Sequence, residues 1–263
     1  MTRGLVALAL ALMFLASPVS QPLADFTYPQ LPEQGSDPSD WIMSGWRAKA
    51  TAKGDLNKDK REDVALILER EKPVDHVRGC GANRDGSAAP PRILVLLLAQ
   101  ADGGYRLSAA DTDIVLRSDE GGIFGDPLEM LLIERGSVLL RHYGGSAWRW
   151  VQTYRFRNQD GGWFLIGYTD GTNHNISRLS TMYDYNPLTG KMEITATDEK
   201  GRPGCYACLP GEKCPATKRC DKGEKRAKRE VTWVKTKRRP LISLEDAYCR
   251  QLADRILPIA PRW

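Results

Sequence analysis

Histidine is scarce in this sequence, and no recognisable catalytic motif compensates for the scarcity. The chain contains only His76, His142 and His174, and no two of them stand at the spacing of metal ligands. Ser146 lies in GGSAW, which lacks the second glycine of the G-x-S-x-G motif that presents a nucleophilic serine. These absences argue against a histidine-based metalloenzyme and against a Ser-His-Asp hydrolase.

Long apolar runs are absent after residue 24, but one stands near the start of the chain. Arg3 precedes an apolar run over residues 5–16, and a helix-breaking stretch with small residues at Ser20 and Ala24 follows. This pattern is typical of a secretory signal peptide, and the run is shorter than the roughly 20 residues that span a bilayer. We expect residues 1–24 to direct export to the periplasm or to the medium, with cleavage after Ser20 or Ala24. The mature chain is expected to have no transmembrane segment.

Amphipathic helical patterns are also rare, whereas short β-type runs recur from residue 63 onward. Runs such as 64–68 and 93–99 are almost wholly apolar, and turn signals separate successive runs. We therefore expect a mainly β fold, with an antiparallel meander over residues 25–200. Residues 201–230 read as an insertion, and 231–263 as a returning strand and a helix. A sandwich, a barrel and a propeller-like arrangement stay open, although the lack of an internal repeat argues against regular blades.

One helix is well signalled, at residues 243–257. Ser243 and Asp246 have the spacing of a capping box in which Asp replaces the usual Glu. Apolar residues then recur at helical spacing, and Pro258 ends the pattern. We expect this helix to pack across one face or one end of the sheet.

Cysteine usage predicts disulfides, because an exported chain folds in an oxidising compartment. Four of the six cysteines lie in the insertion, where local disulfides are favoured over a zinc site or a redox-active pair. The remaining two are suited to pairing across the fold. Six thiols allow fifteen connectivities, and all of them stay open. The cysteines are Cys80, Cys205, Cys208, Cys214, Cys220 and Cys249.

The net charge of +5 hides a strong asymmetry along the chain. Residues 213–239 contain twelve lysines and arginines and three acidic residues, a net charge of +9, which leaves the rest of the chain near −4. Such a stretch attracts polyanions, although many charge runs are only solvated surface. The predicted partner is an anionic envelope component or a protein, and no motif for specific nucleic-acid binding accompanies the stretch. The candidate contact residues are Lys225, Arg226, Lys228 and Arg229.

Residues 54–68, GDLNKDKREDVALIL, place oxygen-bearing groups at alternate positions before an apolar run. Calcium accepts six to eight oxygen ligands, so this spacing predicts a calcium-type loop. An EF-hand is excluded, because Leu66 stands where its bidentate Glu is needed and because a strand pattern follows. The candidate ligands are Asp55, Asn57, Asp59, Asp63 and the carbonyl of Arg61.

This stretch resembles the calcium-binding hairpin loop of FG-GAP or VCBS repeats, whose form is D-x-D-x-D-G-x-x-D before a strand. Lys60 stands where that family has glycine, a position that often needs a positive φ. Lys58, Lys60 and Arg61 also bring positive charge to the loop, which weakens cation binding. The order of further segments, among them DEGGIFGDP and HYGGSAWRW, is similar to an exported bacterial family without an assigned activity. That wider resemblance implies a fold and no reaction.

Two glycine-rich segments are candidates for a ligand site. HYGGSAWRW, residues 142–150, holds Trp148, Arg149 and Trp150, a possible stacking platform for a sugar or a peptide. Two tryptophans that alternate onto one sheet face are also typical of a core. DEGGIFGDP, residues 119–127, holds three acidic residues, and paired carboxylates at a suitable separation perform hydrolysis. These acidic residues are Asp119, Glu120 and Asp126.

The sequence thus favours an exported β-rich binding or interaction protein over an enzyme. Such a protein would carry a degenerate calcium-type loop at 55–63 and a basic, cysteine-rich loop at 201–230. The alternative is a periplasmic hydrolase that uses the carboxylates of the glycine-rich loop 119–126.

Overall fold

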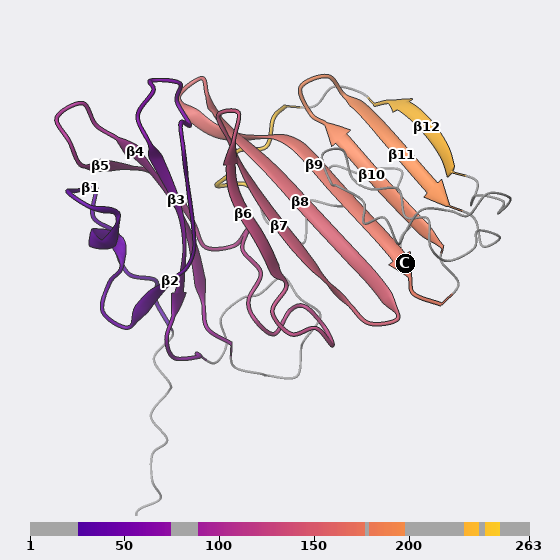
Figure 1. The fold of residues 1–263 in the computed structure, drawn as a ribbon, viewed down its shortest axis with the longest axis horizontal. Coiled ribbons are helices and arrows are strands. Elements are labelled where there is room, and N and C mark those ends of the chain that lie inside the picture. The colour runs from indigo at the N-terminus through magenta and orange to yellow at the C-terminus, as the bar shows by residue number, and fades with distance from the viewer. Residues whose placement is uncertain (1–25, 75–88, 177–178, 198–228, 237–239, 248–263) are drawn as a thin grey trace, which may run out of the picture.

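A computed structural model describes residues 26–74, 89–176, 179–197, 229–236 and 240–247, and in these ranges the protein is mainly β, as predicted. Two antiparallel sheets make up the fold (Figure 1). The smaller sheet has the order β1-β5-β4-β3-β2, with β1 (Gln34–Gly35), β2 (Trp46–Gly54), β3 (Asp63–Arg70), β4 (Arg92–Ala99) and β5 (Tyr105–Asp111). A short 3-10 helix, η1 (Pro38–Trp41), follows β1.

The larger sheet is a meander in which each strand pairs with the next one along the chain. Its order is β12-β11-β10-β9-β8-β7-β6. The strands are β6 (Leu128–Glu134), β7 (Ser137–Gly145), β8 (Trp148–Gln159), β9 (Gly162–His174), β10 (Ser180–Asn186), β11 (Lys191–Thr197) and β12 (Arg229–Lys235). Because β11 and β12 are paired along their whole length, residues 198–228 connect two neighbouring strands.

Strands β3 and β4 are buried on both faces, which explains why their sequences are almost continuously apolar. One face packs against Trp41 and Trp46 from the N-terminal segment. The other face, with Ile67 and Leu96, belongs to the main core. A strand with one solvated face would instead alternate polar and apolar residues.

The main core is shared by the two sheets. Ile67 and Leu96 of the smaller sheet belong to the same buried cluster as Leu140, Tyr154 and Tyr168 of the larger sheet. Strands β2 and β6 are in contact where the sheets meet. The two sheets therefore meet at β2 and β6 and fill one core between them.

The structure contains one strand that the sequence did not predict. β2 was not expected, because the predicted β-type runs begin only at residue 63. Strand β5 ends at Asp111. The Oδ1 atom of Asp111 accepts hydrogen bonds from the backbone N–H groups of Asp113 (2.9 Å) and Ile114 (2.7 Å), and these bonds turn the chain away from the sheet.

The predicted helix over 243–257 is not shown. Ser243 instead forms an antiparallel bridge with Phe164 of β9, and two backbone hydrogen bonds hold it there. The cap itself is present, since the backbone N–H of Asp246 donates to Ser243 Oγ (3.1 Å). Leu244 and Ala247 are buried in the main core, and residues 248–257 lie outside the described ranges.

Several predicted features lie outside the described residues: the signal peptide at 1–24, all six cysteines, and most of the basic stretch. Export and the disulfides therefore stay predictions. Among the residues that the structure describes, no helix is both long enough and apolar enough to cross a bilayer.

Candidate ligand-binding site

The two glycine-rich segments meet at one end of the larger sheet. Gly122 forms a parallel bridge with Gly145, the last residue of β7. The backbone N–H of Ile123 donates to the carbonyl of Gly145 (3.1 Å), and the N–H of Gly145 donates to the carbonyl of Gly121 (2.9 Å). The loop over residues 119–127 thus extends the end of β7, and the two segments form one unit.

Glycine is required here because backbone packs directly against backbone. A Cβ atom on Gly121 would lie 2.1 Å from the carbonyl oxygen of Gly125, and one on Gly145 would lie 2.1 Å from that of Trp148. A Cβ atom on Gly144 would lie 2.5 Å from an indole carbon of Trp150. The glycines therefore let the loop reach β7 and let one indole lie close to the strand.

An open pocket of about 420 Å³ lies at this junction, within the usual size range of small-molecule sites. Trp148 and Trp150, which alternation places on the same side of β8, both line it, so the predicted pair is brought together. The indole of Trp148 is 46% exposed, and neither tryptophan belongs to a core cluster of the described residues. The full lining is Glu120, Gly122, Ile123, Gly145, Ser146, Trp148 and Trp150.

Arg149, the third residue predicted in this segment, does not line the pocket. Its guanidinium carbon lies 4.0 Å from the centre of the Phe124 ring, a cation–π contact. Phe124 in turn packs against Tyr143 of β7, with ring centres 5.8 Å apart. Arg149 therefore helps to hold the loop against the sheet instead of facing a ligand.

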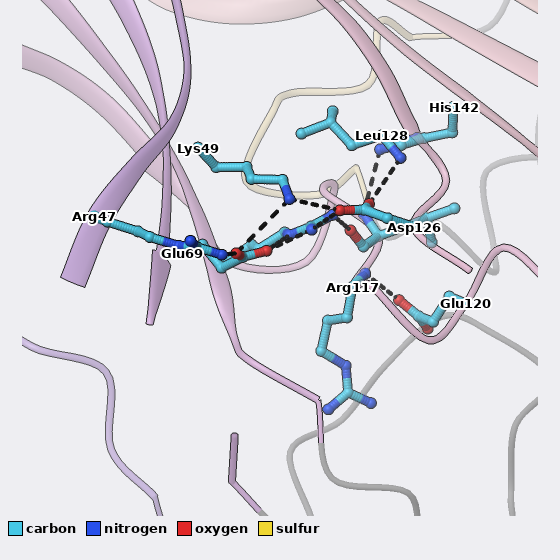
Figure 2. Close-up of polar contacts among 10 residues, drawn as sticks. Arg47, Lys49, Glu69, Arg117, Glu120, Asp126, Leu128 and His142 are labelled. Carbon is cyan, nitrogen blue, oxygen red and sulfur yellow. Dashed lines mark hydrogen bonds and ion pairs between the residues drawn. The ribbon is translucent and has the colours of Figure 1, made fainter. Parts of the chain in front are cut away.

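A buried ion network fastens the same loop to the smaller sheet (Figure 2). The Arg92 side chain on β4 has no exposed surface, and it bonds to Glu69 of β3 and Asp126 of the loop. It also donates to the carbonyl of Leu116 (2.6 Å). The five hydrogen bonds of Arg92 match the five donors of a guanidinium group, so its buried charge is fully satisfied.

Two more cations reach this network from β2, as Figure 2 shows. Lys49 Nζ lies 2.8 Å from an oxygen of Asp126, and an Arg47 nitrogen lies 2.5 Å from an oxygen of Glu69. Burial alone raises the pKa of each carboxyl, but the hydrogen bonds and charges of Arg92 and its neighbours outweigh it. They hold the pKa of Asp126 well below its usual range and lower the pKa of Glu69.

These contacts bear on the hydrolase alternative, which needs two carboxylates that face a substrate. Asp126 is directed at Arg92 and Lys49, and its lowered pKa prevents it from donating a proton at neutral pH. Glu120 lines the pocket, where its Oε2 atom accepts a hydrogen bond from the backbone N–H of Arg117 (2.6 Å). Asp126 is therefore unsuited to serve as the proton donor of a carboxylate pair with Glu120.

His142 of β7 is close to this network and is fully buried. Its Nε2 atom accepts a hydrogen bond from the backbone N–H of Leu116 (3.3 Å). Burial lowers the pKa of His142 to about 3, so the imidazole is neutral at physiological pH. It supports the backbone next to Arg92.

A second polar cluster, which the sequence did not single out, lies on the core-facing side of β8 and β9. Tyr154 Oη donates to Gln152 Oε1 (3.0 Å), and Tyr168 Oη donates to Asp170 Oδ2 (2.7 Å). Burial raises the pKa of Asp170. Gln152 is two residues from Trp150 on the same strand, so the cluster lies between the core and the pocket. The sequence pattern W-x-Q-x-Y over residues 150–154 could have indicated this cluster, because alternate residues of a strand lie on the same face.

The predicted calcium loop connects β2 to β3, so it does precede a strand. Asp55 accepts hydrogen bonds from the backbone N–H groups of Lys58 (2.6 Å), Asp59 (3.1 Å) and Lys60 (3.0 Å). Lys58 and Lys60 have φ angles of 67° and 69°. Lys60 therefore takes the left-handed conformation that the resemblance assigns to glycine, at an energetic cost of roughly 1–2 kcal/mol.

The other candidate ligands are directed at protein groups. Asp63 is fully buried and accepts from the backbone N–H groups of Leu56 (2.7 Å) and Ala99 (2.8 Å). Asp59 is ion-paired with Arg61, and the amide of Asn57 donates to it (2.7 Å). In the described part of the chain, no group of three His, Cys, Asp or Glu side chains is arranged to hold a metal. In this arrangement the loop does not fit a calcium ion, because Arg61 occupies the Asp59 carboxylate.

Calcium binding at this loop stays a prediction, and it requires Arg61 to leave Asp59. We expect calcium to raise the melting temperature of Arg61→Gln more than that of the unmodified protein. A tenfold excess of calcium over its Kd would stabilise the variant by about 1.4 kcal/mol. Thermal melts with calcium and with a chelator measure this. The control is Lys53→Gln, which removes an equal charge that pairs with Glu62 (3.1 Å). If calcium changes the melting temperature of neither Arg61→Gln nor the unmodified protein, the loop is only a structural turn.

The predicted basic contacts cannot be placed in this site. Lys225, Arg226 and Lys228 lie outside the described residues. The backbone of Arg229 begins β12 and pairs with Thr197.

Comparison of the chain with protein-family models, with curated proteins and with solved structures finds no match. The resemblance of residues 54–68 to FG-GAP loops therefore stays a prediction.

Proposed function

We propose that the protein is an exported binding protein that takes a sugar in the pocket formed by Trp148 and Trp150. The observation that carries this proposal is that both indoles line one pocket together with the polar side chains of Glu120 and Ser146. The predicted signal peptide at 1–24 supports export to the periplasm or to the medium.

The chemistry of the lining suits a sugar ring. Indole faces stack on the apolar C–H faces of such a ring, while its hydroxyl groups require polar partners at the rim. Ser146 both donates and accepts hydrogen bonds, and the Glu120 carboxylate accepts them. The bond from Arg117 fixes the orientation of Glu120 before a ligand arrives, which reduces the entropy cost of binding.

The basic stretch 213–239 adds a second, electrostatic contact in this proposal. Its net charge of +9 on a chain whose remainder is near −4 suits an anionic envelope component. Such attraction weakens as salt is added, whereas stacking on Trp148 and Trp150 changes little with salt. Salt dependence therefore separates the two contacts.

The test is a binding screen of the chain from residue 25 onward against neutral and acidic oligosaccharides, followed by calorimetry on the best binder. Trp148→Ala is expected to weaken binding roughly tenfold, because a lost aromatic contact costs about 1 kcal/mol or more. The matched control is Trp233→Ala, since Trp233 is 66% exposed on β12 and does not line the pocket. The proposal is wrong if no oligosaccharide binds at millimolar concentration or if Trp148→Ala binds as well as the unmodified protein.

A further inference from the structure

Exposed apolar side chains gather at the end of the larger sheet that carries the pocket. Ile123 is 74% exposed, Phe124 43%, Trp148 46% and Ile176 78%. They are four of the seven large apolar side chains that are exposed in the described residues. We call these four residues the apolar tip.

The three connections that carry the tip are tied to one another. Ile123 is bonded to Gly145 at the end of β7, as described above. The backbone N–H of Asn175, next to Ile176, donates to the carbonyl of Ala147 (2.9 Å), which precedes Trp148. The Trp148 ring also packs on His174, with ring centres 4.8 Å apart. The loop over 119–127, the β7–β8 turn and the end of β9 therefore form one surface.

Antiparallel pairing puts these connections at the same end of the sheet. The end of β7, the start of β8 and the end of β9 lie together at the lower edge of Figure 1. The exposed side chains thus belong to residues in or next to the connections at this end of the sheet. Their exposure is costly in water, and grouped apolar residues of this kind mark interaction surfaces.

We propose that the apolar tip inserts into the surface of a lipid bilayer. A stable protein interface usually buries about 800 Å² on each partner, with 20–30 residues a side. Four side chains on three loop ends are too few for that, but they suit a fluid apolar phase, which needs no complementary shape. Trp148 is of the residue type that settles at the boundary between headgroups and acyl chains.

A cationic side chain next to the apolar tip also suits contact with a lipid bilayer. The guanidinium group of Arg149 contacts the Phe124 ring, so insertion of this ring brings a cation close to the lipid phosphates. Phe124 and Ile176 are not among the residues that line the pocket, whereas Ile123 and Trp148 are. Insertion of the tip would therefore place the pocket next to the lipid surface.

The test measures binding of the chain from residue 25 onward to vesicles of phosphatidylcholine, alone and with phosphatidylglycerol, by co-sedimentation. The buffer contains 0.5 M salt, so that contacts of the basic stretch are largely screened. We expect binding to both kinds of vesicle, and we expect Phe124→Ser with Ile176→Ser to weaken it at least tenfold. Ile176→Ser alone, which changes neither the pocket lining nor the contact between Phe124 and Arg149, is expected to bind oligosaccharides unchanged.

The matched control is Leu132→Ser with Val231→Ser, which removes two apolar side chains of 45% and 44% exposure on β6 and β12. Circular dichroism confirms that both double variants fold. The proposal is overturned if the unmodified protein binds neither kind of vesicle, or if the two double variants lose equal affinity. Absence of vesicle binding together with self-association through the tip would identify a protein contact instead. A loss of oligosaccharide binding in Trp148→Ala with vesicle binding retained would leave both proposals standing.

Discussion

We expect Arg92→Met to lower the free energy of unfolding by about 3–5 kcal/mol. The substitution removes the only fully buried cation of the three that contact Glu69 and Asp126, and the partly exposed Lys49 and Arg47 remain beside these carboxylates. Without Arg92 the pKa of each carboxyl rises, so protonation relieves the charge that Lys49 and Arg47 do not compensate. The deficit relative to the unmodified protein should therefore shrink as the pH falls from 7 toward 5. Urea denaturation at the two pH values measures it.

Arg47→Met is the matched control, because Arg47 bonds to the same Glu69 carboxylate but is 60% exposed. Exposed ion pairs contribute about 1 kcal/mol or less. We therefore expect Arg92→Met to have a much lower free energy of unfolding than Arg47→Met. Equal losses for the two variants would show that burial of the Arg92 charge is not what makes it important.

The second large effect is expected for Gly121→Ala. The added Cβ atom would lie 2.1 Å from the carbonyl oxygen of Gly125, and neither group is a flexible side chain that can move aside. The turn between Gly121 and Gly125 must therefore open, which displaces Glu120 and Ile123 from their places in the pocket lining. We expect a loss of about 2–3 kcal/mol in stability and of at least tenfold in oligosaccharide affinity.

Gly125→Ala in the same loop separates steric contact from backbone strain. Gly125 has a φ of 71°, but a Cβ atom there meets nothing within 4 Å. Gly125→Ala should therefore lower the free energy of unfolding by only about 1–2 kcal/mol, the cost of a non-glycine residue in the left-handed conformation, and leave the pocket intact. Calorimetry with the best oligosaccharide distinguishes the variants, and equal affinity for both would contradict the steric account.

The sequence predicted the parts of the fold that depend on local pattern. The apolar runs of β3 and β4 were recognisable because both faces of these strands are buried. β2 was missed for the opposite reason. Its sequence WRAKATAKG relies on alanines, which have low strand propensity, and a bulge between Ala48 and Ala50 interrupts the alternation.

The site was predictable in part for a similar reason. Trp148 and Trp150 are two residues apart on one strand, so their shared face follows from alternation alone. The partners of Asp126 did not follow, because Arg92 and Glu69 stand at the ends of apolar strands and meet the loop only through tertiary packing. The helix over 243–257 is not shown, because residues 242–244 are bonded to β9 and residues 248–257 lie outside the described ranges.

The meander of β6 to β12 has a consequence for how the chain assembles. Each strand pairs with the strand immediately before it in the chain, so the sheet can grow from one side as the chain emerges. In the smaller sheet, by contrast, β1 must wait for a distant strand, β5. Residues 198–228 stand in the sequence between the last two strands, so the sheet from β6 to β11 can form before β12 is added.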